Sequence, residues 1–267
     1  MPSRMHTVLC FACADDGIGR FDRASLSQQT SMELFIFGLN EPDAVCGSRE
    51  SPAEVCKWKR VICNAEGEIT DLAWSFRSDK EAGTLRFEFL PCCMKRLKMV
   101  YNALTGTIKL GDLPEKMENL DISGNQLTGS LDLDALPGAM RHVGLGDNKF
   151  TGEISLDHLP EGLRSLYISE NRLCGTVSFT SLPQTLDSLE LATNSFEGSL
   201  DLTRLPASLE TLHVFNNGFS GTVDLSDIPP SLQRLIASTN KLTGTVRVPP
   251  GVNCSFNGNE DLTVEII

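Results

Sequence analysis

One asparagine recurs every 23 residues through most of this 267-residue chain. Self-similarity at a fixed spacing is typical of solenoids, in which each repeat packs mainly against its neighbours. A glycine follows each asparagine four residues later, and a Leu-Pro or Ile-Pro pair opens each unit. We call the seven asparagines the asparagine ladder: Asn102, Asn125, Asn148, Asn171, Asn194, Asn217 and Asn240.

The pattern inside each unit predicts one coil of a solenoid. The spacing Leu186-x-x-Leu189-x-Leu191 marks a short strand whose leucines point inward while the intervening residues face outward. A second alternating segment, such as Leu200-x-Leu202, follows the glycine and predicts another short extended stretch. The expected fold class is α/β, mostly β. We expect a right-handed solenoid with a parallel sheet on its concave face, short extended or 3-10 segments outside and a small N-terminal helical cap.

The asparagines are expected to be structural and not ligand-binding. Each lies where the chain turns out of the inner strand, in a coil whose interior is lined by leucines. A buried side-chain amide can satisfy backbone groups of its own turn and of the neighbouring turn, which would otherwise stay unpaired. The ladder therefore predicts a continuous hydrogen-bonded spine.

The chain divides into four expected segments. They are a leader or weak signal peptide over 1–24, an N-terminal cap over 25–66, eight repeats over 67–248 and a C-terminal cap or truncated end over 249–267. The first repeat, at about 67–89, is a degenerate copy. In the leader, Arg4 precedes a short apolar run that ends in Ala12-Cys13-Ala14, as in a secretion signal. A disordered leader or a wrongly assigned start fits the same residues.

Two motifs in the cap segment point to a family. The chain reads Leu39-Asn-Glu-Pro42 and then Cys56-Lys-Trp58-Lys-Arg-Val61-Ile-Cys63. This segment resembles the N-terminal cap of plant-type extracellular leucine-rich-repeat proteins, whose N-x-L-x-G repeat the units also resemble. The 23-residue length and the regular Leu-Pro look most like leucine-rich-repeat and surface-antigen proteins of kinetoplastid protozoa. Over about 31–260 the resemblance implies this fold, a Cys56–Cys63 disulfide and a Trp58 that covers the open end of the core.

The cysteines leave an alternative open. Nine are present, so at least one is not paired within the chain. Cys56 and Cys63 could instead be reduced core residues of an intracellular relative, and Cys46 could add a second bridge. The sequence Asn253-Cys-Ser255 is a formal N-glycosylation motif, which matters only if the chain is secreted.

A ligand is expected on the outward positions of the inner sheet. These positions vary against a fixed frame, as in a binding surface built by repetition. Adjacent coils should place a semi-apolar patch at Tyr167, Glu190, His213, Phe215 and Ile236. A second, basic cluster at the N-terminal end of the same face includes Lys98 and Tyr101 beside Lys95 and Arg96. Scattered surface residues with no function would look the same.

Composition and missing motifs narrow the function. With 35 acidic and 23 basic residues the formal charge is −12, which disfavours nucleic acid and anionic membranes as partners. No stretch approaches the roughly 20 apolar residues of a membrane-spanning helix. The exposed aromatic residues favour a protein or peptide partner. No catalytic, metal-binding or cofactor motif stands out, so we expect neither an enzyme, a metal site nor a cofactor.

Glu190 and His213 resemble an acid–base pair, but the stacking of coils brings such positions together in any case. Three interpretations of the chain remain. It is a secreted or cell-surface recognition module, an intracellular, cytoplasmic scaffold with the same solenoid, or a fragment of a larger membrane-anchored receptor or surface antigen.

Overall fold

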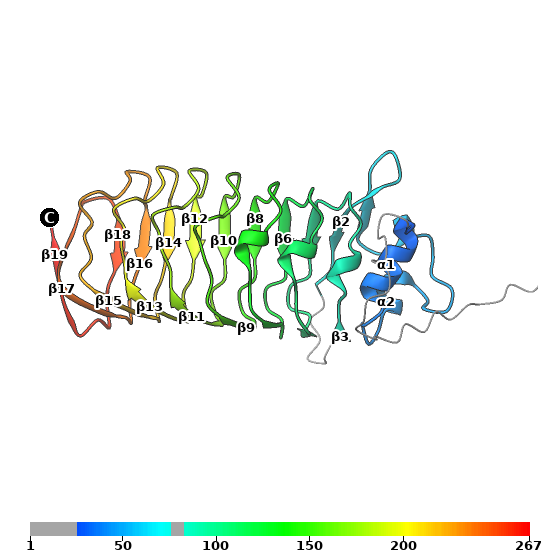
Figure 1. The fold of residues 1–267 in the computed structure, drawn as a ribbon, viewed down its shortest axis with the longest axis horizontal. Coiled ribbons are helices and arrows are strands. Elements are labelled where there is room, and N and C mark those ends of the chain that lie inside the picture. Colours follow the sequence, from blue (N-terminus) through cyan, green and yellow to red (C-terminus); the bar gives the residue numbers. More distant parts are fainter. Residues whose placement is uncertain (1–25, 76–82) are drawn as a thin grey trace, which may run out of the picture.

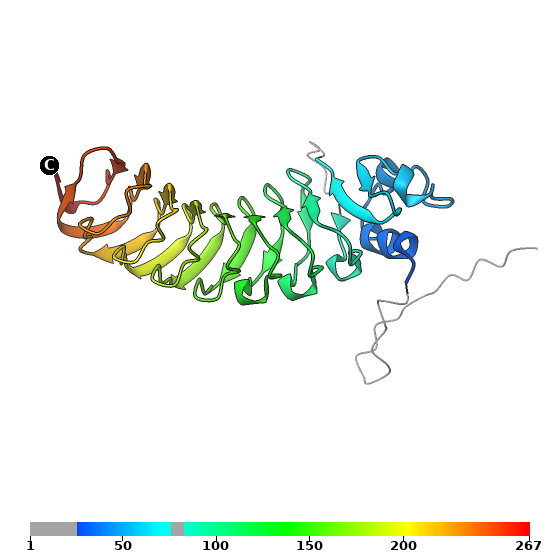
Figure 2. The ribbon, with the colours of Figure 1, turned by 90° about the horizontal axis from the view of Figure 1, so that it is seen from above.

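The computed structural model describes residues 26–75 and 83–267, so the leader expected over 1–24 lies outside the described residues. Figure 1 shows a row of stacked coils with a helical cap at one end, and Figure 2 shows that the row is curved. This confirms the expected fold class, a mostly β solenoid of leucine-rich-repeat type. Within the described ranges no helix is long and apolar enough to cross a membrane.

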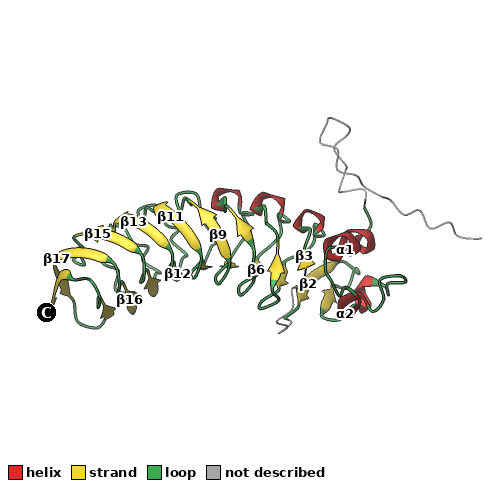
Figure 3. Ribbon diagram, turned by 90° about the horizontal axis from the view of Figure 1, so that it is seen from below, coloured by secondary structure: helices red, strands yellow, loops and turns green. Residues whose placement is uncertain are grey.

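The inner side of the arc carries a ten-stranded sheet (Figure 3). We call it the concave sheet. Its first two strands are antiparallel, and all later neighbours are parallel. In order across the sheet the strands are β1 (Val61–Cys63), β2 (Ile69–Ala73), β4 (Arg96–Lys98), β6 (Asn119–Asp121), β8 (His142–Gly144), β10 (Ser165–Tyr167), β12 (Ser188–Glu190), β14 (Thr211–His213), β16 (Arg234–Ile236) and β18 (Asn253–Ser255).

The outer side of the arc carries a seven-stranded parallel sheet (Figure 3). Its strands are β7 (Thr128–Gly129), β9 (Lys149–Gly152), β11 (Arg172–Thr176), β13 (Ser195–Ser199), β15 (Gly218–Gly221), β17 (Lys241–Val248) and β19 (Asp261–Ile266). Nearer the cap the outer segments are a two-stranded pair and three 3-10 helices. These are β3 (Gly83–Thr84), β5 (Leu104–Thr105), η3 (Phe87–Phe89), η4 (Leu110–Asp112) and η5 (Leu133–Ala135).

The core runs the length of the solenoid because the register repeats. Leu166 pairs with Leu189, and Leu212 pairs with both Leu189 and Leu235 in the concave sheet. All four leucines are fully buried. One repeat alone could not cover these side chains, so each coil depends on its neighbours for burial.

The asparagine ladder supplies the hydrogen bonds that leucines cannot make. The side-chain oxygen of Asn148 accepts from the Leu127 N–H at 3.0 Å, and its amide donates to the Ile122 carbonyl at 3.1 Å and the Leu145 carbonyl at 3.2 Å. The same connections recur from coil to coil along the spine. Asn125 shows that they cross coils, because it bonds to Leu104 of the preceding one at 3.0 Å.

Residues 249–267 continue both sheets. β18 pairs with β16, and β19 pairs with β17. Asn259 extends the ladder, since its side-chain oxygen accepts from the Leu242 N–H at 3.0 Å and its amide donates to the Ala237 carbonyl at 3.0 Å. It follows Asn240 by 19 residues instead of 23, which hides it from a search at fixed spacing.

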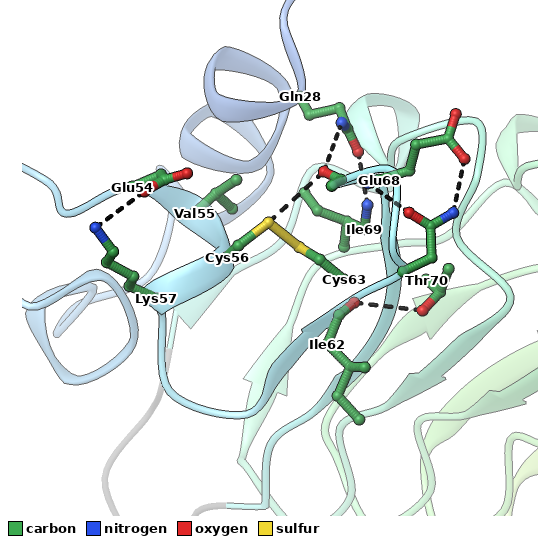
Figure 4. Close-up of a disulfide and its surroundings, with 12 residues drawn as sticks. Gln28, Glu54, Val55, Cys56, Lys57, Ile62, Cys63, Glu68, Ile69 and Thr70 are labelled. Atoms are coloured by element: carbon green, nitrogen blue, oxygen red, sulfur yellow. Dashed lines mark hydrogen bonds and ion pairs between the residues drawn. A yellow bond between two sulfur atoms is a disulfide. The ribbon is translucent and has the colours of Figure 1, made fainter.

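The cap is built from short elements held together by side-chain bonds. They are α1 (Gln28–Ile36), α2 (Asp43–Cys46), the 3-10 helix η2 (Val55–Lys57) and strand β1. Gln28 joins α1 to the start of β2, because its oxygen accepts from the Ile69 N–H at 2.7 Å and its amide donates to the Gly67 carbonyl at 3.3 Å (Figure 4). Trp58 is 3% exposed and donates to the Ala53 carbonyl at 2.8 Å.

The Cys56–Cys63 disulfide expected from the resemblance is present (Figure 4). It closes the loop between η2 and β1. The expectation that Cys46 could add a second bridge is wrong. This thiol is free and buried, and it donates to the Pro42 carbonyl at 3.2 Å. Burial, with Asp43 nearby, raises the pKa of Cys46 and keeps it protonated.

Candidate binding surface on the concave sheet

A hollow of about 580 Å³ lies on the concave sheet, over strands β1 to β10. We call it the concave hollow. Its lining includes Lys98, Tyr101 and Tyr167, which the sequence placed in two separate clusters. The structure brings the three together in one recess.

Three large apolar side chains around the hollow are exposed to solvent. Ile62 is 57% exposed, Tyr101 is 58% exposed and Tyr167 is 38% exposed. Both tyrosines of the chain are therefore used here. Ile62 comes from β1 in the cap hairpin, so the cap contributes directly to the site. Exposed apolar groups beside a recess are typical of surfaces that bind other molecules.

Glycines deepen the hollow. A β-carbon on Gly144 would lie 2.7 Å from Oδ1 of Asp121, so the missing side chain leaves room for this carboxylate. A β-carbon on Gly124 would lie 2.3 Å from Cδ1 of Tyr101, so this aromatic ring rests against bare backbone. Gly144 occupies an outward position of strand β8, and its role as the floor of the hollow depends on the side chains that surround it.

The charged groups of the hollow are paired with one another. Arg96 forms an ion pair with the largely buried Asp71, and Lys98 lies 3.4 Å from Asp121. The hollow therefore offers no surplus of cations to a polyanion. The pairing of Arg96 with Asp71 also fixes the guanidinium across the first two parallel strands.

His142 belongs to the same lining, and sequence reasoning did not select it. Its Nδ1 lies 2.7 Å from Oγ of Ser165, which is almost fully buried on the next strand. Among the described residues only Nδ1 of this imidazole has a hydrogen-bond partner, so Nε2 can bond to a ligand. The hollow thus combines apolar rims with a polar centre.

The remaining residues of the predicted patch lie further along the same sheet. The register aligns Tyr167 with Glu190, Glu190 with His213, and His213 with Ile236. Phe215 packs beside His213, with ring centroids 6.3 Å apart. The structure therefore forms the predicted row, but only Tyr167 reaches the concave hollow.

His213 is the most buried titratable group of this row. Its side chain is 17% exposed, its Nδ1 lies 3.5 Å from the Glu190 carboxylate and its Nε2 is buried without a partner in the described structure. Burial lowers the pKa of His213, Glu190 raises it and Arg234 lowers it. The neutral imidazole is favoured, and no group of three or more metal-ligating side chains is found among the described residues.

No family model and no curated protein matches the chain. The solved structures that are similar to it in fold include the following three. The crystal structure of PEPR1-AtPEP1 has a TM-score of 0.56 and 22% identity, covering 90% of this chain and 42% of that one. YopM from Yersinia enterocolitica WA-314 has a TM-score of 0.55 and 26% identity, covering 78% of this chain and 44% of that one. A plant ice-binding protein has a TM-score of 0.53 and 20% identity, covering 90% of this chain and 97% of that one.

The chain aligns with less than half of the length of the first two of these proteins. Together with the 23-residue coil and the asparagine ladder, the likenesses assign the leucine-rich-repeat solenoid fold. The fold does not specify the function, because a solenoid frame determines shape while a few variable surface side chains determine the ligand.

Proposed function

We propose that this chain is a non-catalytic protein- or peptide-binding module that takes an extended segment of its partner in the concave hollow. The observation that carries the proposal is the ring of exposed apolar side chains, Ile62, Tyr101 and Tyr167, around a recess floored by glycine. Aromatic anchors beside a pocket supply most of the binding energy in many protein interfaces.

The polar lining supports a peptide over a polyanion. Arg96 and Lys98 already have carboxylate partners, so a nucleic acid would have to displace Asp71 and Asp121. Backbone groups of an extended peptide can instead bond to polar side chains such as His142 without removing a charge pair.

Display of random peptides tests this function. A library is selected against the immobilised full chain, and the enriched peptide is titrated against the wild type and the double variant Tyr101→Ser, Tyr167→Ser. We expect the double variant to bind at least tenfold more weakly, a loss of about 1.4 kcal/mol. Phe37→Ser is the matched control, because Phe37 is an aromatic residue 59% exposed on the cap, away from the hollow.

Equal binding by the double variant and the wild type would overturn the proposed site. An equal loss of peptide affinity in Phe37→Ser and in the double variant would also overturn it. The affinity would then depend on any exposed aromatic residue and not on the hollow. The denaturation midpoint of each variant, measured alongside, separates loss of binding from loss of folding.

We further propose that the module works outside the cell or on its surface. The Cys56–Cys63 disulfide supports this location, since disulfides persist mainly in oxidising compartments. Mass spectrometry of the thiol-blocked, non-reduced protein from its own cells tests it. A bridge supports the extracellular module or a receptor fragment. Free thiols at both positions would overturn this location and favour an intracellular scaffold.

A further inference from the structure

The glycosylation motif Asn253-Cys254-Ser255 forms the whole of β18, the last strand of the concave sheet. Asn253 pairs with Arg234 and Ser255 pairs with Ile236 on the neighbouring strand β16. Because side chains alternate along a strand, Asn253 and Ser255 share one face and Cys254 takes the other. Cys254 packs against the hydrophobic core, so both polar residues of the motif face the concave side.

The side chain of Asn253 differs from those of the asparagine ladder. Asn253 is exposed. Its backbone N–H donates to the Gln233 carbonyl at 2.9 Å, but its side-chain amide makes no hydrogen bond within the described part of the chain. A ladder amide such as that of Asn240 is buried and donates to Val214, Ala237 and Ser238 carbonyls. The side-chain amide of Asn253 can therefore be modified without loss of a hydrogen bond. The same modification of a ladder asparagine would break the bonds of the spine.

The position is also sterically open. β18 has a strand neighbour on one side only within the described sheet, and Figure 1 shows it near the end of the stack of coils. A bulky group on Asn253 can extend past this edge without meeting another coil. Exposed sheet edges invite unwanted pairing with other chains, and a bulky polar group there would block such pairing.

We propose that Asn253 carries an N-linked glycan, an inference that rests on the secretory route of the proposed function. The donor is a lipid-linked oligosaccharide pyrophosphate. The amide nitrogen Nδ2 attacks the anomeric carbon, a C–N bond forms, the C–O bond to the lipid pyrophosphate breaks, and the amide proton passes to a base of the transferase. No oxidant or reductant is needed.

The glycan would leave the concave hollow open. The lining of the hollow ends at Tyr167 on β10, and β18 lies four strands further along the sheet. At a strand spacing of about 4.8 Å, Asn253 is roughly 19 Å from that edge of the hollow. The modification thus shields the far end of the concave sheet and directs partners toward the tyrosines.

The test expresses the full chain behind a cleavable secretion signal in eukaryotic cells. The mass of the secreted protein is measured by mass spectrometry before and after treatment with a peptide N-glycosidase. We expect the mass to fall by one oligosaccharide and Asn253 to be converted to Asp. Asn253→Gln and Ser255→Ala should both lack the glycan, whereas Ser255→Thr should keep it. Asn216→Gln, at an exposed asparagine outside any such motif, is the control and should keep it.

Secreted protein with a formed Cys56–Cys63 bridge and an unmodified Asn253 would overturn the inference. A glycan that persists in both Asn253→Gln and Ser255→Ala would also overturn it. Neither outcome touches the proposed function, because peptide binding is scored separately with the tyrosine variants. Conversely, a chain that is glycosylated at Asn253 but binds no selected peptide would contradict the proposed function and support the glycosylation of Asn253.

Discussion

The ring of Tyr101 lies against the backbone of Gly124, so closely that a β-carbon there would be 2.3 Å from the ring carbon Cδ1. The left-handed φ of Gly124 does not by itself demand glycine, since Asp147 and Thr193 adopt φ values of 50° and 54° at the same place in later coils. The glycine is needed for the space that the aromatic ring occupies.

Gly124→Ala should therefore displace Tyr101 and weaken peptide binding in the hollow by about tenfold, with a loss of about 1–2 kcal/mol in stability from the left-handed backbone. Titration with the selected peptide and urea denaturation measure the two effects. Gly138→Ala is the control, because a β-carbon there meets nothing within 4 Å. Unchanged binding in Gly124→Ala would mean that the ring position is unimportant.

Asn148→Ala should destabilise the chain by roughly 3 kcal/mol, because it leaves the Leu127 N–H and the Ile122 and Leu145 carbonyls without their side-chain partner. Urea denaturation followed by circular dichroism measures the change. Asn257→Ala, at an exposed asparagine that is not among the residues with positive φ, should cost well under 1 kcal/mol. Equal losses of unfolding free energy in the two variants would show that the hydrogen bonds of the spine do not stabilise the chain.

Thr239→Asn should stabilise the chain by about 0.5–1 kcal/mol. Thr239 is β-branched and holds a φ of 53°, a left-handed conformation that asparagine adopts more readily. Thr222→Asn serves as the comparison, because Thr222 is also exposed and is not among the residues with positive φ. Differential scanning calorimetry gives both values, and a gain of the same size at Thr222 would contradict the strain argument.

Acidification should destabilise the chain through His213. Burial lowers its folded-state pKa below the usual value of 6.5, so the unfolded chain takes up a proton first as the pH falls. The stability from the neutral imidazole is complete above about pH 6.5 and is lost as the pH falls through the folded-state pKa. Between neutral and mildly acidic pH, the denaturation midpoint should fall more in the wild type than in His213→Gln. His142→Gln, at an exposed ring, is the control, and an acid response in His213→Gln equal to that of the wild type would refute the assignment.

The sequence predicts those features that depend on a fixed spacing. The period of 23 residues was enough to place Tyr167, Glu190, His213 and Ile236 in one row, because parallel strands in equal coils keep their register. The pairing of Cys56 with Cys63 followed from the resemblance and not from spacing alone. Phe215 was placed beside this row by the same logic, and it packs against His213.

The concave hollow could not be predicted in the same way. Ile62 reaches it through the antiparallel pairing of β1 with β2, which lies outside the repeat. The role of Gly144 depends on how the Asp121 side chain fills the space beside it, and a pattern of residue types does not specify that. Asn259 was missed because the last coil is shortened and breaks the period.

The central claim is that the partner binds in the concave hollow, and hydrogen–deuterium exchange of the full chain with and without the selected peptide tests it most directly. The account predicts that protection on binding falls on β4, β6, β8 and β10, with the turn that carries Tyr101. Protection confined to the outer sheet, or to β14, β16 and β18, would contradict it.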